Sequence, residues 1–247
     1  IRDVAVTGVQ TCALPICSWV HSLLVLWRYL WILLGHKWAV IRTGLWINVK
    51  LRGTGFRVSW RRLFVHDLSK FGCAELWPYA NFYQGTETKD KESIEKRNAA
   101  FKKAWRHHYL CNDHHPEFFV RSLRGSEEDG GENVRHDEDD ILRMPEEAVM
   151  EMVADWFGAS LGYRGVWPKS GAWAWLSTEK LRQLPMRKSS LLTLCAIMSA
   201  LGFSQDFKGV FKWEDIEECA EFTRKEKEKL LRLKEVGQAK GGTKKFK

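Results

Sequence analysis

The stretch Phe64-Val65-His66-Asp67-Leu68-Ser69-Lys70-Phe71 joins a histidine and an aspartate within an apolar, helix-like pattern. A neutral imidazole nitrogen and a carboxylate oxygen can bind one divalent ion together, and the carboxylate can also bridge two ions. Adjacent His and Asp side chains at a helix end are placed to do this. We therefore expect His66 and Asp67 to form the centre of a divalent-metal site in an all-helical domain.

A second histidine–aspartate pair, His136-Asp137, offers a comparison within the same chain. It lies in the segment 125–140, which holds eight acidic residues, three glycines and almost nothing apolar. Such a segment cannot bury enough surface to order itself, so we expect a mobile acidic loop. Because the second pair has no apolar frame around it, we assign it to solvent.

More histidines lie at the end of a helix expected over residues 90–115. Residues spaced i, i+4 and i+7 lie close to one line along a helix, and two neighbouring lines carry possible ligands. The first line is His108, Asn112 and His115, and the second is His107, Cys111 and His114. Either line can present two imidazoles to a common centre, so the sequence leaves the choice between them open.

Asp155 lies in the middle of an apolar helix expected over residues 145–161. A buried carboxylate needs a partner, which can be a metal, an arginine or a helix N-terminus. The order histidine, His-Asp, histidine, histidine, aspartate along the chain favours the metal. The expected ligands are His36, His66, Asp67, His108, His115 and Asp155, with His107, Asn112, His114 and Glu75 as alternates or supporting residues.

Apolar residues recur at three- and four-residue spacing and strict alternation is absent, so we expect an all-α fold. Pro116 ends one helix and Pro145 begins the next. Helices are expected near residues 18–34, 36–51, 60–70, 73–84, 90–115, 145–161, 174–184, 188–202 and 212–236. We expect a compact helical metal-binding domain over 18–176, C-terminal helices over 177–236 that pack on it or extend it, and a disordered basic tail over 237–247.

The net charge of +8 is concentrated at the C-terminal end, because residues 223–247 alone hold ten Lys or Arg and three Glu. This basic tail is compatible with nucleic-acid binding, but a solvated helix end is the favoured interpretation. The six cysteines form no C-x-x-C pair, which favours reduced thiols and a cytoplasmic protein over a disulfide framework.

The N-terminal end of the chain joins a segment of non-biological appearance to an apolar one. Residues 6–16 resemble the translation of a DNA-sequencing adapter, so we expect residues 1–17 to be a non-native leader that carries no information about the fold. The Leu- and Trp-rich segment that follows, 18–35, contains His21 and Arg28 and is too short for a membrane span. We expect a buried first helix there, with an interfacial helix anchored by tryptophans as the alternative.

The ordered ligand pattern resembles the signature of the HD-domain superfamily, which consists of helical metal-dependent phosphohydrolases. A longer set of motifs consists of His66–Phe71 with Glu75 and Pro78-Tyr79, then Ala104-Trp105, His108, Asn112, His114-His115, and Met144-Pro145 with Asp155-Trp156. These motifs carry a closer resemblance, over roughly residues 35–176, to an uncharacterised family, domain of unknown function 5662.

The superfamily resemblance implies an HD-like bundle that hydrolyses a small phosphorylated substrate, a phosphate mono- or diester such as a nucleotide. It implies one or two divalent transition-metal ions (Mn, Fe, Zn or Ni) and catalytic roles for Asp67 and Lys70. A first ion would take His36, His66, Asp67 and Asp155, and a second would take His108 and His115, or His107 and His114, with Asp67 bridging.

The sequence is also compatible with two other functions. The same ligand set can hold two irons in oxygenases of the HD fold. Alternatively, the protein is a non-enzymatic helical binding protein whose metal is structural or absent, with the basic tail docking on an acidic partner.

Overall fold

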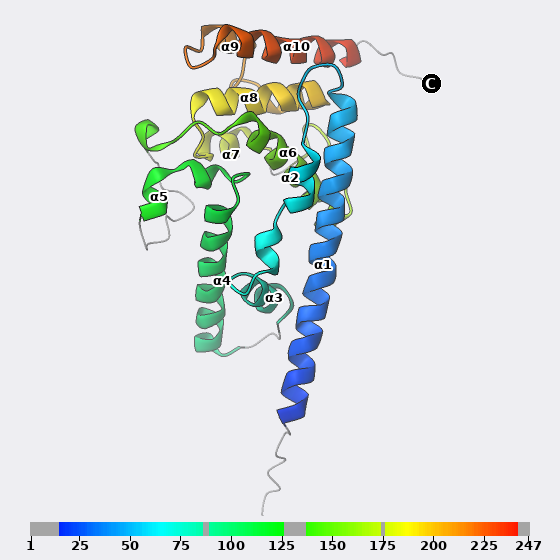
Figure 1. Cartoon of the computed structure of the whole chain (residues 1–247), viewed down its shortest axis with the longest axis vertical. Coiled ribbons are helices and arrows are strands. Elements are labelled where there is room, and N and C mark those ends of the chain that lie inside the picture. The colour runs from blue at the N-terminus through cyan, green and yellow to red at the C-terminus, as the bar shows by residue number, and fades with distance from the viewer. Residues whose placement is uncertain (1–14, 86–88, 126–136, 174–175, 242–247) are drawn as a thin grey trace, which may run out of the picture.

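The computed structural model describes residues 15–85, 89–125, 137–173 and 176–241. These residues form helices joined by short connections and no strand, which confirms the predicted all-α class (Figure 1). In chain order the elements are α1 (Pro15–Lys50), α2 (Trp60–Val65), η1 (Leu68–Phe71), α3 (Leu76–Gln84), α4 (Lys91–Cys111), η2 (Pro116–Phe119), α5 (Arg121–Gly125), η3 (Glu138–Asp140), α6 (Glu146–Arg164), α7 (Thr178–Gln183), α8 (Lys188–Met198), the π-turn η4 (Ser199–Phe203), η5 (Ser204–Phe207), α9 (Glu214–Glu218) and α10 (Arg224–Gly241).

Helix α1 corrects the prediction of two helices that meet at Gly35-His36. It is one helix of 36 residues, about 54 Å long at 1.5 Å per residue. A single glycine costs a helix only about 1 kcal/mol, and neither a proline nor a capping residue stops the chain here. The buried face also continues without a break from Val25 through Leu33 to Val40. Packing of this continuous face outweighs the local weakness at Gly35.

The central contact of the fold is between α1 and α6, which pack along their lengths. Gly158 makes the close approach possible, since a Cβ placed there would come within 2.9 Å of the Val40 Cα. A Cβ at Gly162 would lie 3.1 Å from the His36 Cα. Glycines on one face of α6 therefore bring the middle of α1 within reach of the polar side chains of α6.

The C-terminal helices pack over one end of this pair. Figure 1 shows α10 lying across α8, which in turn lies beside α6. The main core cluster joins α1, α6, α8 and α10 through residues such as Ile47, Phe157, Leu194 and Leu233. Helix α10 extends to Gly241, beyond the predicted helix end at residue 236. The segment 212–236 predicted as one helix is two, α9 and α10.

Within the part of the chain that the structure describes, two helical stretches are long and apolar enough to cross a membrane by length and composition, Trp19–Lys50 and Lys188–Phe207. Over an apolar segment of 18 residues in each, two thirds of the second but only a third of the first is buried inside the protein. The second is therefore accounted for as a core helix, whereas part of α1 exposes apolar side chains. Most of the predicted leader and of the predicted acidic loop, including His136, lies outside the described residues.

Candidate metal centre

The His66-Asp67 pair lies at a sharp reversal of the chain between α2 and η1. Ser59 caps the N-terminus of α2, and His66 caps its C-terminus. Asp67 adopts left-handed backbone angles (φ 54°, ψ 26°) and is the only non-glycine residue with positive φ among the described residues. Aspartate tolerates this conformation better than most residues. The segment 60–70 is therefore not the single helix predicted, because the reversal turns both side chains into the protein.

The first donor set combines α1, this reversal and α6. His36 Nε2 lies 3.1 Å from Asp155 Oδ1 and 3.6 Å from Asp67 Oδ2. His66 Nε2 lies 3.4 Å from Asp67 Oδ2 and 3.3 Å from Asp155 Oδ1. Ligand atoms about 2.1 Å from one ion stand about 3.0 to 3.4 Å apart in octahedral or tetrahedral geometry. These four side chains are thus spaced as ligands of a single transition-metal ion.

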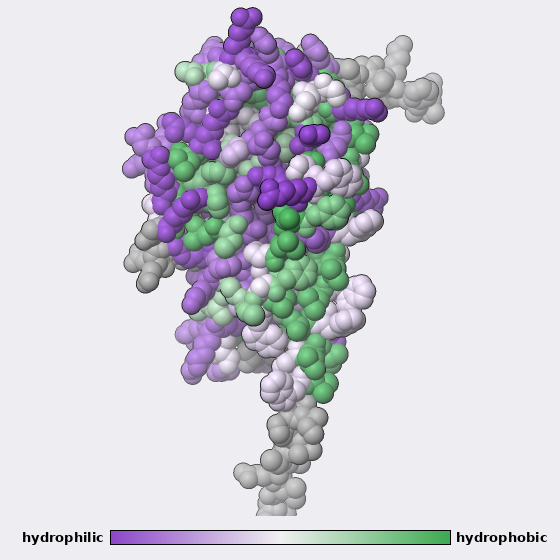
Figure 2. Space-filling model, viewed as in Figure 1, coloured by the Kyte–Doolittle hydropathy of each residue, from purple (hydrophilic) through white to green (hydrophobic). Residues whose placement is uncertain are grey.

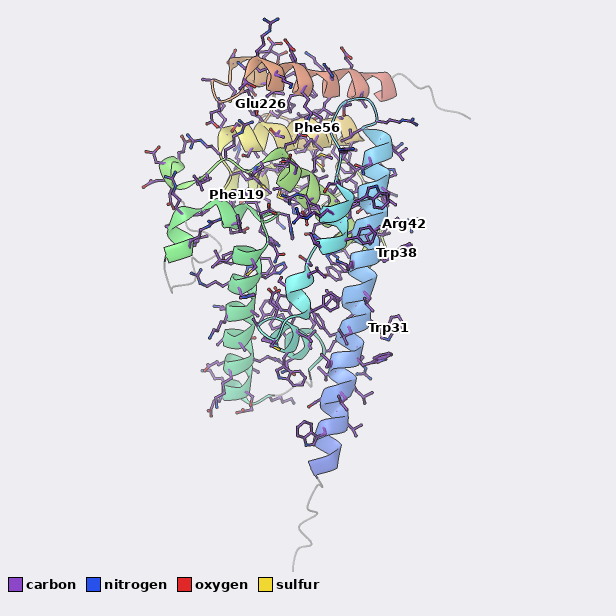
Figure 3. The ribbon with its side chains drawn as sticks, in the orientation of Figure 1. Trp31, Trp38, Arg42, Phe56, Phe119 and Glu226 are labelled. Carbon is purple, nitrogen blue, oxygen red and sulfur yellow. The ribbon has the colours of Figure 1, made fainter. Side chains whose placement is uncertain are left out.

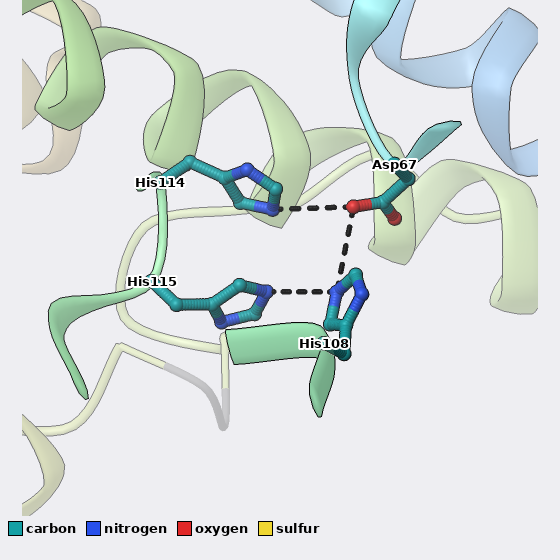
Figure 4. A group of neighbouring side chains, drawn as sticks. All are labelled: Asp67, His108, His114 and His115. Carbon is teal, nitrogen blue, oxygen red and sulfur yellow. Dashed lines mark hydrogen bonds and ion pairs between the residues drawn. The ribbon is translucent and has the colours of Figure 1, made fainter. Parts of the chain in front are cut away.

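The second donor set combines the same aspartate with three histidines at the end of α4 (Figure 4). Asp67 Oδ1 lies 3.4 Å from His108 Nε2 and 3.4 Å from His114 Nε2. His115 Nε2 lies 3.0 Å from His108 Nε2. The donor atoms of each set lie within 4.8 Å of one another. The two oxygens of Asp67 therefore face two different donor sets.

Several donor atoms in these sets are buried and have no hydrogen-bond partner. They include Nε2 of His36, His66 and His114, and Oδ1 of Asp67. Buried polar atoms in proteins are nearly always hydrogen-bonded, and an unpaired one is costly. Unpaired atoms that converge from separate elements are what a cation would satisfy, so the residues present fit a bound metal.

The opposite ring nitrogens of three histidines are held by two buried glutamates. His66 Nδ1 donates to Glu151 Oε1 at 2.9 Å, and His114 Nδ1 lies 3.4 Å from the same oxygen. His108 Nδ1 donates to Glu75 Oε2 at 2.9 Å. A carboxylate at Nδ1 fixes the tautomer that leaves Nε2 free as a ligand. Glu75, which the sequence marks as an alternate ligand or a supporting residue, lies beside His108 in this layer.

Arg62 anchors this supporting layer. Its guanidinium makes two hydrogen bonds of 2.7 Å to Asp113 and one of 2.7 Å to Glu151. Burial alone would raise the pKa of Glu151, but hydrogen bonds from His114 and His66 lower that pKa to about 2. Glu151 is therefore ionised at neutral pH and faces one histidine of each donor set.

The carboxylates and histidines of the centre shift each other's pKa values in opposite directions. Burial works against ionisation of Asp67, but the neighbouring His66 and Lys70 charges hold its pKa well below the usual range. Burial also opposes the charge on His66, yet Asp67, Asp155 and Glu151 raise its pKa to about 9. A metal that binds here would therefore displace a proton from His66.

Of the histidines on α4 and just after it, His108, His114 and His115 enter the centre and His107 does not. His107 points away, 44% of its side chain is exposed, and its Nδ1 donates to Glu75 at 2.7 Å. His114 and His115 both enter the centre because α4 ends at Cys111, with Asn112 as its C-cap. The prediction that His108 and His115 share one helical line was therefore wrong, although both residues do reach the site.

All six predicted ligands lie together, and His114 joins them. Glu151 was not predicted, although it precedes Asp155 by four residues and so shares its face of α6. Arg62, which pairs with Glu151, is only partly exposed. Tyr163 was not predicted either, and its ring stacks on His36 with centroids 4.9 Å apart.

The fold and the donor sets together define an all-helical protein with a buried histidine–carboxylate cluster of metal-binding spacing. The chain belongs to a family of unknown function, DUF5662, whose model matches residues 26–199, well over half of the chain. No curated protein and no solved structure matches the chain. The family resemblance drawn from the motifs is thereby confirmed, and a relationship to the HD superfamily stays a prediction.

Proposed function

We propose that this protein is a metal-dependent phosphohydrolase that acts on a small phosphate mono- or diester and uses two divalent ions. The observation that carries the proposal is the position of Asp67 between two donor sets, with Oδ2 facing one and Oδ1 facing the other. A carboxylate that bridges two ions is the usual way to hold a pair of metals close enough to act on one phosphoryl group.

The chain would hold the first ion with four side chains and the second with three more, Asp67 being common to both sets. The first set is His36, His66, Asp67 and Asp155, and the second is Asp67, His108, His114 and His115. Divalent ions supply a Lewis acid for phosphoryl oxygens and lower the pKa of water. Glu75 and Glu151 keep the imidazoles in the tautomer that such binding requires.

Lys70 supplies a fixed positive charge beside the bridging carboxylate. Its Nζ donates to Asp67 Oδ2 at 2.6 Å, and 11% of its side chain is exposed. Burial alone would lower its pKa, but the neighbouring Asp67 raises that pKa well above the usual value, so the ammonium group keeps its proton. An ammonium group in this place can bind a phosphate oxygen and stabilise the charge that develops on the leaving group.

The test is metal analysis of the purified full chain, followed by hydrolysis assays on a panel of phosphate mono- and diesters. We expect about two equivalents of a transition metal and metal-dependent hydrolysis of at least one class of ester. Lys70→Gln should retain the metal but lose about 100-fold in kcat, while Lys188→Gln, at the remote start of α8, should behave as the unaltered chain.

The other two functions are distinguishable outcomes of the same experiment. Bound iron whose absorption spectrum changes with oxygen, together with no hydrolysis, would replace the hydrolase by an oxygenase. A chain without transition metal, in which His66→Ala changes neither stability nor metal content, would refute the metal centre itself. Salt-sensitive nucleic-acid binding that is lost on removal of residues 223–247 would then favour a binding protein.

A further inference from the structure

The outer side of α1 carries a run of large exposed apolar side chains, which we call the α1 stripe. It consists of Trp19, Leu23, Trp27, Trp31, Leu34 and Trp38. Their exposed fractions range from 48% for Leu34 to 73% for Trp19. Figure 3 shows Trp31 and Trp38 extending away from the other helices, and Figure 2 shows apolar colour gathered along this helix. The stripe does not belong to the core.

The stripe occupies one side of α1, opposite to the side that packs on the protein. At 100° per residue, its six members fall within an arc of about 120° and extend over about 29 Å of helix. The buried residues Val25 and Tyr29 fall on the opposite side. Single exposed apolar residues are ordinary, but a contiguous apolar surface of this length is typical of an interaction site.

The charged side chains of α1 and of the segment that follows it are basic, apart from the titratable histidines. Residues 15–66 contain eight Lys or Arg and no Asp or Glu. Arg28 and Arg42 are exposed on α1 beside the stripe. Arg42 projects from the same side of α1 as Trp38 (Figure 3). An occupant of this surface must therefore be apolar where it meets the tryptophans and anionic at its margins.

We propose that the α1 stripe docks the protein on an anionic lipid surface, with α1 lying in the plane of the interface. Tryptophan side chains prefer the boundary between acyl chains and headgroups, and basic residues beside them pair with anionic headgroups. A membrane supplies both features at once.

Two other arrangements fit the same surface less well. A second copy of the chain docked face to face would bring two basic surfaces together without an acidic partner, since residues 15–66 hold no carboxylate side chain. A membrane-spanning α1 would place Arg28 among acyl chains. It would also strip the second half of α1 from α6, where Gly158 lies against Val40. Docking in the plane of the interface leaves both features intact.

The test is flotation of the full chain with vesicles of phosphatidylcholine alone and of phosphatidylcholine mixed with phosphatidylglycerol. We expect binding to the anionic vesicles that weakens as salt is added. Trp27→Ala/Trp31→Ala should lower the partition coefficient at least about tenfold. Arg28→Gln and Arg42→Gln should each lower it about fivefold. The control is Trp77→Ala, an exposed tryptophan on α3 outside the stripe, which should bind as the unaltered chain does.

Several outcomes would overturn the proposal. They are no flotation with anionic vesicles, equal binding to neutral vesicles, and unchanged binding by the stripe variant. A fourth outcome is a dimer that light scattering detects in the absence of lipid and that the Trp27→Ala/Trp31→Ala variant no longer forms. This result would assign the surface to a second copy of the chain. Metal content and helical circular dichroism should be the same in all variants. The result is therefore independent of the proposed hydrolysis.

Discussion

Glu151 is the residue whose replacement most directly tests the arrangement of the centre. Its Oε1 accepts a hydrogen bond from His66 Nδ1 at 2.9 Å and faces His114 Nδ1 at 3.4 Å, while Oε2 accepts from Arg62 at 2.7 Å. In Glu151→Gln the side chain keeps its volume but loses its charge. Whichever way the amide is turned, its NH2 group then faces either Arg62 or the two histidines, so one donor opposes another.

The expected effect is a loss of metal affinity at both donor sets. Loss of a supporting carboxylate lowers metal affinity about 10- to 100-fold, which equals about 1.4 to 2.7 kcal/mol. The loss should affect both ions, because His66 belongs to the first set and His114 to the second. Arg62 keeps its two hydrogen bonds to Asp113, so the fold should persist.

Competition titration with a metal-binding dye measures this effect. The matched control is Glu147→Gln, the same change of charge at an exposed position four residues earlier on α6, and it should leave both affinities unchanged. Affinities in Glu151→Gln that equal those of the control would refute the reasoning. A loss confined to one ion would show that Glu151 supports only one of the two histidines.

Three further predictions concern stoichiometry, packing and pH. His36→Ala and His115→Ala each remove a ligand from only one donor set, so each variant should retain one ion. Native mass spectrometry counts the ions, and retention of both ions or of neither would contradict the assignment of two separate donor sets. Gly158→Ala should lower the free energy of unfolding by about 1 to 3 kcal/mol, because the added Cβ meets the backbone of α1. Gly35→Ala should raise the free energy of unfolding by up to about 1 kcal/mol, because its Cβ meets nothing within 4 Å. Urea titration measures both changes, and equal effects would count against the close helix contact. Metal affinity should rise with pH between about 6.5 and 9, because a ligand imidazole must be neutral and the neighbouring carboxylates raise the pKa of His66 to about 9. Calorimetric titrations that give the same metal affinity across this pH range would contradict this prediction. In the metal-free chain the same raised pKa stabilises the fold below pH about 6.5 and ceases to do so as the pH rises through about 9.

Much of the candidate centre could be predicted from the sequence because the signals are local. Adjacency of His66 and Asp67 and the apolar frame of Asp155 can be read along a single segment. These residues do converge, and both aspartates share the first donor set. The helical class also follows from local spacing, since periodicity of apolar residues is a property of one helix at a time.

The supporting layer could not be predicted in the same way. Glu151 supports histidines 85 and 37 residues away in the chain, and Arg62 reaches across 89 residues to Glu151. Such pairings depend on how α2, α4 and α6 pack, and no local pattern encodes them. Only the spacing between Glu151 and Asp155 gave a hint, because residues four apart share a helix face.

The sequence by itself determined which side chains are available, their helical setting and the family to which the chain belongs. The tertiary structure alone decided that α1 is continuous, that α4 ends at Cys111 so that His114 and His115 both turn inward, and that His107 turns outward. The physical reason is that helix ends and helix phase depend on which face is buried. At the α1–α6 contact the burial of a continuous apolar face outweighs the small local cost of Gly35.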